Sequence, residues 1–126
     1  MTNPAARASE HDAVKAAFQP YLEGAVTGSS ETMKAAFHPD ATIYGYIGPD
    51  LFGGPIQGLY DWHDSNGAAT GLKAEFAAID IEGSIATVRL ELDNWTGHRF
   101  TDMFTLLKTD GEWKIISKVF YLHPED

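Results

Sequence analysis

The sequence has no cysteine. Disulfide bonds, thiolate metal sites and cysteine nucleophiles are therefore excluded together, and this suits a reducing cytoplasm. The N-terminal segment contains no apolar core of a secretory signal, and no apolar stretch approaches the length of a membrane span. We therefore expect a cytoplasmic protein without a membrane partner.

Basic residues are scarce as well. The chain has 9 lysines and arginines against 18 aspartates and glutamates, and its formal net charge at pH 7 is −9. A protein that binds nucleic acid needs a basic surface to neutralise the phosphates. No local run of basic residues forms an exception here, so we expect no nucleic-acid partner.

Motifs for nucleotide cofactors and metal ions are also missing. The sequence contains no G-x-G-x-x-G, no phosphate-binding loop and no G-x-S-x-G. None of the five histidines stands in an H-x-x-x-H or H-E-x-x-H spacing. The sequence therefore predicts no metal site and no cofactor.

What is present is enough apolar material for one core. The chain has 126 residues, the usual size of one domain, and 44% of them are hydrophobic. Small polar residues at the start predict a flexible arm over residues 1–9. A single domain over residues 10–126 is expected to follow.

Helix periodicity marks the first half of the chain. Apolar residues recur at three- and four-residue steps between His11 and Gly28, with Ser9 as the predicted N-cap. Pro20 lies inside this pattern and is expected to bend or break the helix. The following segments predict a helix over 31–37 capped by Ser30 and a strand over 41–47. Residues 48–55 are expected to form a loop, with the tip of a short hairpin as the alternative, and a helix is expected over 57–67.

The second half is β-rich. Its four runs cover residues 72–82, 84–95, 98–109 and 112–122, and a residue pair ending in glycine separates each run from the next. Consecutive hairpins of this kind predict a twisted meander of four antiparallel strands. Helices gathered at one end of the sequence must cover one face of that sheet, which gives an α+β class.

This element order resembles the nuclear-transport-factor-2-like superfamily, especially its SnoaL-like and lumazine-binding groups. The segments that carry the resemblance are "FHPDA" before the first strand and "LLKTDGEWKI" across the last hairpin, and the likeness covers residues 11–124. It implies a cystatin-like cone, in which a curved antiparallel sheet wraps around the N-terminal helices and leaves a pocket at its open end. It also implies a homodimer formed through the outer face of the sheet.

Asp102 is the first candidate for chemistry. It shares one face of its predicted strand with Phe100 and Phe104, because strand side chains alternate. Such neighbours should desolvate the carboxylate and raise its pKa, which suits acid or base catalysis. The alternative is structural, with Asp102 accepting hydrogen bonds from Tyr21, Trp62 or the backbone.

Lys118, in the last predicted strand, is a candidate partner for Asp102. Counting outward from the Asp110-Gly111 turn pairs Asp102 with Val119, one step from Lys118. A buried ion pair would be inert, whereas a desolvated lysine would be an amine nucleophile. Structural pairing is the preferred interpretation.

Aromatic side chains from several predicted elements define a candidate ligand pocket. In a cone these elements converge, so the rings would surround a planar or hydrophobic ligand, with hydroxyl and indole donors at the rim. Core packing is the alternative role of each ring, and Trp113 is assigned to the core. The candidate pocket residues are Tyr21, Tyr44, Tyr46, Tyr60, Trp62, Trp95, Phe104 and Phe120.

Three functions remain open from the sequence. The first is a small-molecule-binding domain that uses this aromatic pocket. The second is a cofactor-free isomerase, cyclase or dehydratase, with Asp102 as general acid or base and Tyr21 or His63 as its partner. The third is a dimeric interaction module without chemistry. His63 is a candidate pocket base, although a lone histidine near the surface is usually only a polar residue.

Overall fold

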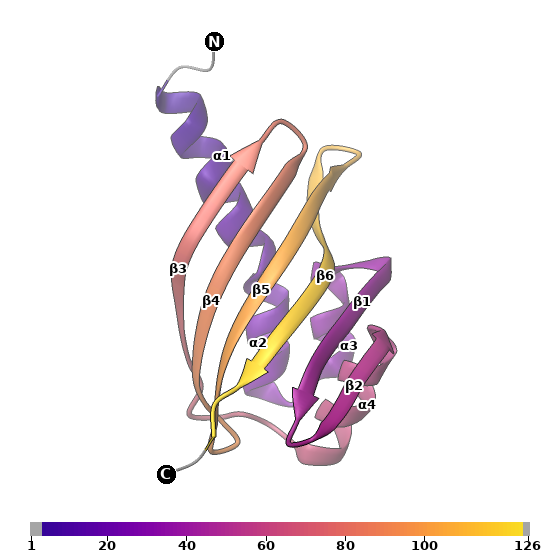
Figure 1. The fold of residues 1–126 in the computed structure, drawn as a ribbon. Coiled ribbons are helices and arrows are strands. Elements are labelled where there is room, and N and C mark those ends of the chain that lie inside the picture. Colours follow the sequence, from indigo (N-terminus) through magenta and orange to yellow (C-terminus); the bar gives the residue numbers. More distant parts are fainter. Residues whose placement is uncertain (1–3, 125–126) are drawn as a thin grey trace.

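The computed structural model describes residues 4–124 (Figure 1). Helices and a short 3-10 turn occupy most of the first half, and strands occupy the second. In chain order the elements are α1 (Pro4–Ala17), α2 (Gln19–Thr27), α3 (Ser30–Met33), the 3-10 turn Lys34–Ala36, β1 (Phe37–Ile47), β2 (Asp50–Pro55), α4 (Gln57–Asn66), β3 (Lys73–Glu82), β4 (Ile85–Trp95), β5 (His98–Thr109) and β6 (Glu112–Leu122).

The first helix begins earlier than predicted. α1 starts at Pro4, so residues 4–9, including the expected N-cap Ser9, are helical rather than part of an arm. Proline is well suited to the first helical turn, where its missing N–H has no intrahelical partner in any case. Residues 1–3 of the predicted arm lie outside the described residues. The expected effect of Pro20 is present: the helix is interrupted at Phe18, and α2 begins with the proline in its first turn.

Two caps separate α2 from α3. Gly28 ends α2 as predicted, with a left-handed φ of 81° and its N–H bonded to the Gly24 carbonyl. The N-cap of α3 is Ser29 and not the predicted Ser30, because the Ser29 hydroxyl accepts the Thr32 backbone N–H at 3.1 Å. β1 then begins at Phe37, ahead of the predicted residue 41.

The six strands form one curved, open sheet in the order β2-β1-β6-β5-β4-β3, and α1 and α2 cross its concave face (Figure 1). The predicted α+β class, with N-terminal helices wrapped by the sheet, is confirmed. One pair departs from the antiparallel expectation, since β1 and β6 run parallel. The predicted loop over residues 48–55 is also wrong in part: β2 pairs with β1 there as an edge strand, a position that tolerates Pro55.

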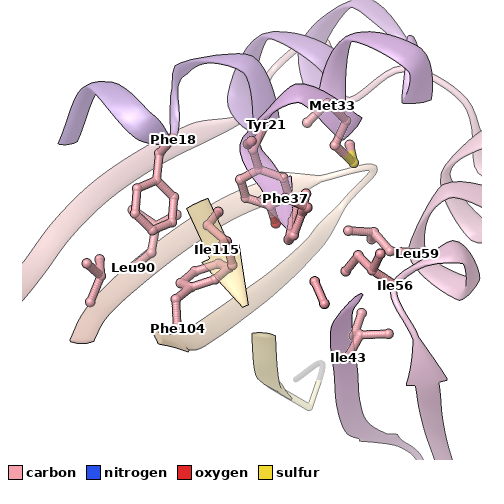
Figure 2. Close-up of a cluster of buried hydrophobic side chains, with 14 of the residues drawn as sticks. Phe18, Tyr21, Met33, Phe37, Ile43, Ile56, Leu59, Leu90, Phe104 and Ile115 are labelled. Carbon is pink, nitrogen blue, oxygen red and sulfur yellow. The ribbon is translucent and has the colours of Figure 1, made fainter. Parts of the chain in front are cut away.

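The core lies between the helices and the concave face of the sheet. Val14, Phe18, Tyr21 and Ala25 are fully buried and follow the helical spacing noted in the sequence. Figure 2 shows Phe18 reaching from the helix towards the sheet, where its ring packs edge-on against Phe104. Burying one such side chain contributes about 1.5–3 kcal/mol.

Candidate functional site

A β-bulge in β6 decides which side chains face the inside of the cone. The register between β5 and β6 follows the predicted count as far as Leu106 opposite Ile115. It then shifts, so that Thr105 lies opposite Ser117 and Ile116 is the extra residue. Because strand side chains alternate, one extra residue reverses which of them point inward.

The bulge places Lys118 on the same face as Asp102. Asp102 lies opposite Phe120 and not, as predicted, opposite Val119, while Lys118 lies opposite Phe104. Lys118 and Asp102 are therefore diagonal neighbours on the inner face, a separation that a long side chain spans. Without the bulge Lys118 would point outward.

Lys118 forms a buried ion pair and a second hydrogen bond. Its Nζ lies 2.6 Å from Asp102 Oδ2 and 3.0 Å from the Tyr21 hydroxyl, to both of which it donates. Asp102 and Tyr21 are fully buried, and Lys118 is 4% exposed. The cluster therefore ties β6 to β5 and to α2 in the centre of the domain.

Aromatic rings surround the ammonium group. Its nitrogen lies 5.4 to 5.9 Å from the centroids of Tyr21, Trp95, Phe104 and Phe120. These faces attract a cation but accept no conventional hydrogen bond. The ammonium has three hydrogens and its two named partners use two of them, so the third is available to a ligand.

Burial dominates the acid–base character of this cluster. It raises the pKa of Asp102 above the ordinary 3.8, against the opposing effects of the charge and hydrogen bond of Lys118 and of the hydrogen bond of Tyr21. Burial also raises the pKa of Tyr21 well above 10.0, and the nearby Asp102 charge adds to the effect. Asp102 Oδ1 has no hydrogen-bond partner among the described residues, so only one of its carboxylate oxygens is satisfied.

A cavity of about 140 Å³ opens beside Lys118. Its volume is close to that of an engineered cavity of about 150 Å³ that binds benzene. The lining comes from β1, β2, α4, β4, β5 and β6, near the end of the sheet where the C-terminus lies (Figure 1). It consists of Ile43, Ile47, Phe52, Leu59, Trp62, Asn66, Trp95, His98, Phe100, Lys118, Phe120 and Leu122. Among these described residues Lys118 alone carries a fixed charge.

The structure gathers some of the predicted pocket residues and separates others. Trp62, Trp95, Lys118 and Phe120 line the cavity. The remaining inward-facing candidates are buried outside the lining: Asp102, Tyr21, Phe104 and Tyr60. Asp102 therefore reaches the cavity only through Lys118, with which it is paired.

Tyr44 and Tyr46 lie on the outer face of the sheet, which corrects their assignment to the pocket. They alternate along β1 with Ile43, which points into the cavity, and they are 45% and 62% exposed. The sequence shows the alternation but not which of its two sets faces inward.

His63 is a structural residue in this fold. It is fully buried in α4, and its Nε2 lies 2.9 Å from the Gly24 carbonyl oxygen near the end of α2. A carbonyl oxygen only accepts hydrogen bonds, so Nε2 carries the hydrogen. His63 does not line the cavity, and its predicted role as a pocket base is not supported by this position.

Sequence reasoning missed the apolar lining from β2 and from the end of β6. Phe52 belongs to the segment expected to be a loop. In β6 the buried positions are odd-numbered before the bulge, at Trp113 and Ile115, and even-numbered after it, at Lys118 and Phe120. The sequence does not show this change, because residues 118–122 place apolar side chains on both faces of the strand and a lysine at the inward position 118.

One neutral donor complements Lys118. Trp95 Nε1 is buried and has no partner among the described residues, although the ring lines the cavity. A buried N–H without an acceptor costs free energy, which a ligand oxygen would recover.

Within residues 4–124 no group of acidic, histidine or cysteine side chains has the arrangement of a metal site. In the same range, every helix is too short or too polar to span a bilayer.

Comparison with known families places this site in context. The family model described as "Putative lumazine-binding" matches residues 9–121. The chain belongs to this family, within the nuclear-transport-factor-2-like superfamily. The match covers both the helical half and the meander, so it includes every residue that lines the cavity except Leu122.

Individual relatives agree with this assignment. A curated protein named aldolase FrzH, from Cladobotryum sp., is 38% identical over 92% of this chain and 94% of its own length. A solved NTF2-like protein of unknown function from Methylobacillus flagellatus is 48% identical, with a TM-score of 0.89 over 92% of this chain and 94% of that one. Another from Shewanella baltica is 38% identical, with a TM-score of 0.89 over 99% and 100%.

Proposed function

We propose that this protein is a cofactor-free enzyme that binds a small, largely apolar aldehyde or ketone in the cavity. The reaction takes place at the carbon next to the carbonyl group, as in an aldol addition or its reverse. The observation that carries this proposal is the buried Lys118, which lines an otherwise uncharged cavity and whose amine is held by Asp102 and Tyr21.

The lining matches the parts of such a substrate. Its carbons would pack against the apolar lining, and its oxygen would accept hydrogen bonds from Lys118 Nζ and Trp95 Nε1. Donors fixed in a water-poor site stabilise the negative charge that develops on a carbonyl oxygen. His98 is the other titratable side chain of the lining and is the candidate to accept the proton from carbon.

The name of the Cladobotryum relative supports this reaction class, since that protein is called an aldolase and is 38% identical to this chain. The fold alone would not support a particular reaction class, because proteins of one fold have many different activities. The proposal assigns Asp102 to positioning Lys118 and not to direct contact with substrate, which differs from the expectation that Asp102 itself is the acid or base.

The test is deuterium exchange at the carbon next to a carbonyl. Benzaldehyde-sized aldehydes and ketones with exchangeable hydrogens, such as cyclohexanone and phenylacetaldehyde, are incubated with the protein in D₂O and followed by proton NMR. We expect exchange to be faster with the wild-type protein and to return to the buffer rate with Lys118→Met. The matched control is Lys108→Met, which removes a lysine from the neighbouring strand outside the cavity.

A second candidate function is binding without chemistry. The observation in its favour is that Asp102 already neutralises Lys118, and a satisfied ion pair is unreactive. A compound that raises the melting temperature further as its concentration increases, yet shows no exchange, would support this candidate and contradict the enzymatic proposal.

The expected homodimer through the sheet remains part of the proposal. Exposed apolar side chains cover the outer face of three neighbouring strands: Tyr44, Tyr46, Met103, Val119 and Tyr121. Exposed apolar patches of this kind mark association surfaces. Light scattering after gel filtration should give the mass of two chains for the wild type and of one chain for Val119→Glu. A wild-type monomer at high micromolar concentration would contradict the dimer.

A further inference from the structure

We infer that Lys118 is a covalent nucleophile, whose amine forms a Schiff base with the carbonyl carbon of the bound aldehyde or ketone. This inference rests on the proposed function, because it requires that the cavity take carbonyl compounds. It goes further by replacing a hydrogen bond to the substrate with a carbon–nitrogen bond.

The first observation behind it is the position of Lys118 in the cluster. Lys118 lines the cavity, whereas both groups to which its Nζ donates, Asp102 and Tyr21, are buried outside the lining. A ligand in the cavity therefore meets the Lys118 side chain before it meets either partner. The approach is flanked by the rings of Trp95 and Phe120, which exclude water from the nitrogen.

The second observation is the incomplete solvation of Asp102. A buried carboxylate is stable when both oxygens accept hydrogen bonds. Asp102 has hydrogen bonds with Lys118 and Tyr21, but its Oδ1 has no partner among the described residues. Such a carboxylate accepts a proton readily, and burial correspondingly raises its pKa. Transfer across the 2.6 Å contact leaves a neutral acid and a neutral amine, with no charge left in the apolar site.

The chemical step then balances without an added reagent. The free amine of Lys118 attacks the carbonyl carbon, and the electron pair of the C=O bond moves to oxygen. The oxygen takes up one proton from the attacking nitrogen and a second that Asp102 returns through the same nitrogen, and it leaves as water, so that a C=N bond forms. The resulting iminium draws electrons from the neighbouring carbon. When a C–H bond breaks there, its proton passes to His98, and when a C–C bond breaks, the far carbon leaves as an aldehyde or ketone after its hydroxyl proton passes to His98. Water finally releases the product and restores the amine.

Other parts of the molecule give weaker evidence of a site than the Lys118 cavity does. His63 Nδ1 is a buried nitrogen without a partner, but the residue lies outside the cavity lining. The apolar outer face of the sheet belongs to the dimer already proposed. A second surface depression, which includes Tyr46, Tyr121 and His123, is lined mostly by exposed or partly exposed residues and by no lysine, arginine, aspartate or glutamate.

The experiment is reductive trapping on the full-length protein. Cyclohexanone is added with sodium borohydride, which delivers hydride to the iminium and fixes the ketone to the nitrogen as a secondary amine. Intact mass and peptide mapping then locate the adduct. We expect a single adduct per chain on Lys118, with Lys108 unlabelled, and complete loss of labelling in Lys118→Arg. The mapping uses the wild-type protein, so it does not depend on the folding of the variant.

A second measurement follows the carbonyl oxygen. Each cycle of Schiff-base formation and hydrolysis replaces that oxygen with one from water, so the wild-type protein should accelerate ¹⁸O uptake from labelled water into cyclohexanone. Lys108→Arg should behave as wild type. Deuterium exchange without an adduct and without accelerated ¹⁸O uptake would overturn the covalent role while leaving the proposed function intact. Absence of binding, deuterium exchange and labelling together would overturn both.

Discussion

Two clusters built from the same kinds of residue lie on β5 and β6, and they differ in their surroundings. In one, Lys108 Nζ donates to Glu10 Oε1 of α1 at 3.0 Å, and Trp113 Nε1 donates to the same oxygen at 2.5 Å. In the other, Lys118 contacts Asp102 and Tyr21. The side chains of the Lys108–Glu10 pair are 34% and 32% exposed, and those of the Lys118–Asp102 pair are 5% and 0% exposed.

The comparison shows that burial, and not the identity of the partners, determines the behaviour of each carboxyl group. Hydrogen bonds from Trp113 and Lys108 lower the pKa of Glu10 below its ordinary 4.5. Asp102 also has a lysine partner at hydrogen-bonding distance, yet desolvation raises its pKa. A pair open to water is therefore a minor structural contact, whereas the same kind of pair in the core is costly to desolvate and costly to break.

Breaking the buried pair should have the largest effect. Lys118→Met leaves Asp102 in the core without a compensating charge, and removal of one member of a buried pair costs about 3–5 kcal/mol. Urea unfolding should show this loss as a lower midpoint with an unchanged slope. Lys108→Met, the matched control on the exposed cluster, should shift the midpoint much less.

The double variant sharpens the same test. Asp102→Leu combined with Lys118→Met replaces the pair by apolar groups and should recover most of the lost stability, because no charge is left unpaired. A double variant as unstable as Lys118→Met would show that the pair holds the fold through geometry and not through charge compensation.

An intermediate loss of stability is expected when a methyl group is added next to the Phe120 ring, which lines the cavity. Gly45 of β1 lies beside Phe120 of β6, and a Cβ at this position would come within 2.6 Å of the Phe120 ring. Gly45→Ala should therefore push this ring aside and cost about 1–3 kcal/mol, the usual range for overpacking. Thermal unfolding measures the loss, and Gly45→Ala with Phe120→Leu should restore part of it. An unchanged melting temperature for Gly45→Ala would mean that the ring moves freely.

The smallest effect is on the pH dependence of stability, to which Glu10 and Asp102 should contribute with opposite signs. The contribution of Glu10 is fully present above pH 4.5 and is lost as the pH falls through its lower folded-state pKa. Asp102 binds its proton more readily when folded, so its share of stability falls as the pH rises from 3.8 through its higher folded-state pKa. Carboxyl ¹³C chemical shifts should show the two midpoints displaced in opposite directions, and a shared direction would contradict the role assigned to burial.

Much of the fold was accessible from the sequence, because it depends on local signals. Turn glycines delimit the four strands of the meander, helical spacing marks α1 and α2, and the alternation around Asp102 places it on the inner face. The start of α1 was missed because small polar residues resemble a loose arm while also being compatible with a helix. β2 was missed because an edge strand tolerates the glycines and proline that usually indicate a loop.

The site was less accessible, because it depends on register and on contacts between distant segments. Lys118 faces inward only because Ile116 is bulged, and a count from the turn cannot include a bulge. Tyr44 and Tyr46 could not be assigned to a face, because β1 has an apolar residue on both sides. The likeness to a known family predicted the cone. The arrangement of Lys118, Asp102 and Tyr21 was seen only in the structure, because it joins segments that are far apart in the sequence.

The parallel pairing of β1 with β6 also has a consequence for the order of folding. Its register brings Thr42 next to Ser117, so it joins the two halves of the chain, whereas the hairpins of the meander are local. Long-range parallel pairings form late, because most of the chain must first be ordered. The cavity takes Ile43 and Phe52 from one half and Lys118 and Phe120 from the other, so it is completed in this late step. A molecule bound there should contact both halves of the chain and slow their separation, so that the unfolding rate falls as ligand is added.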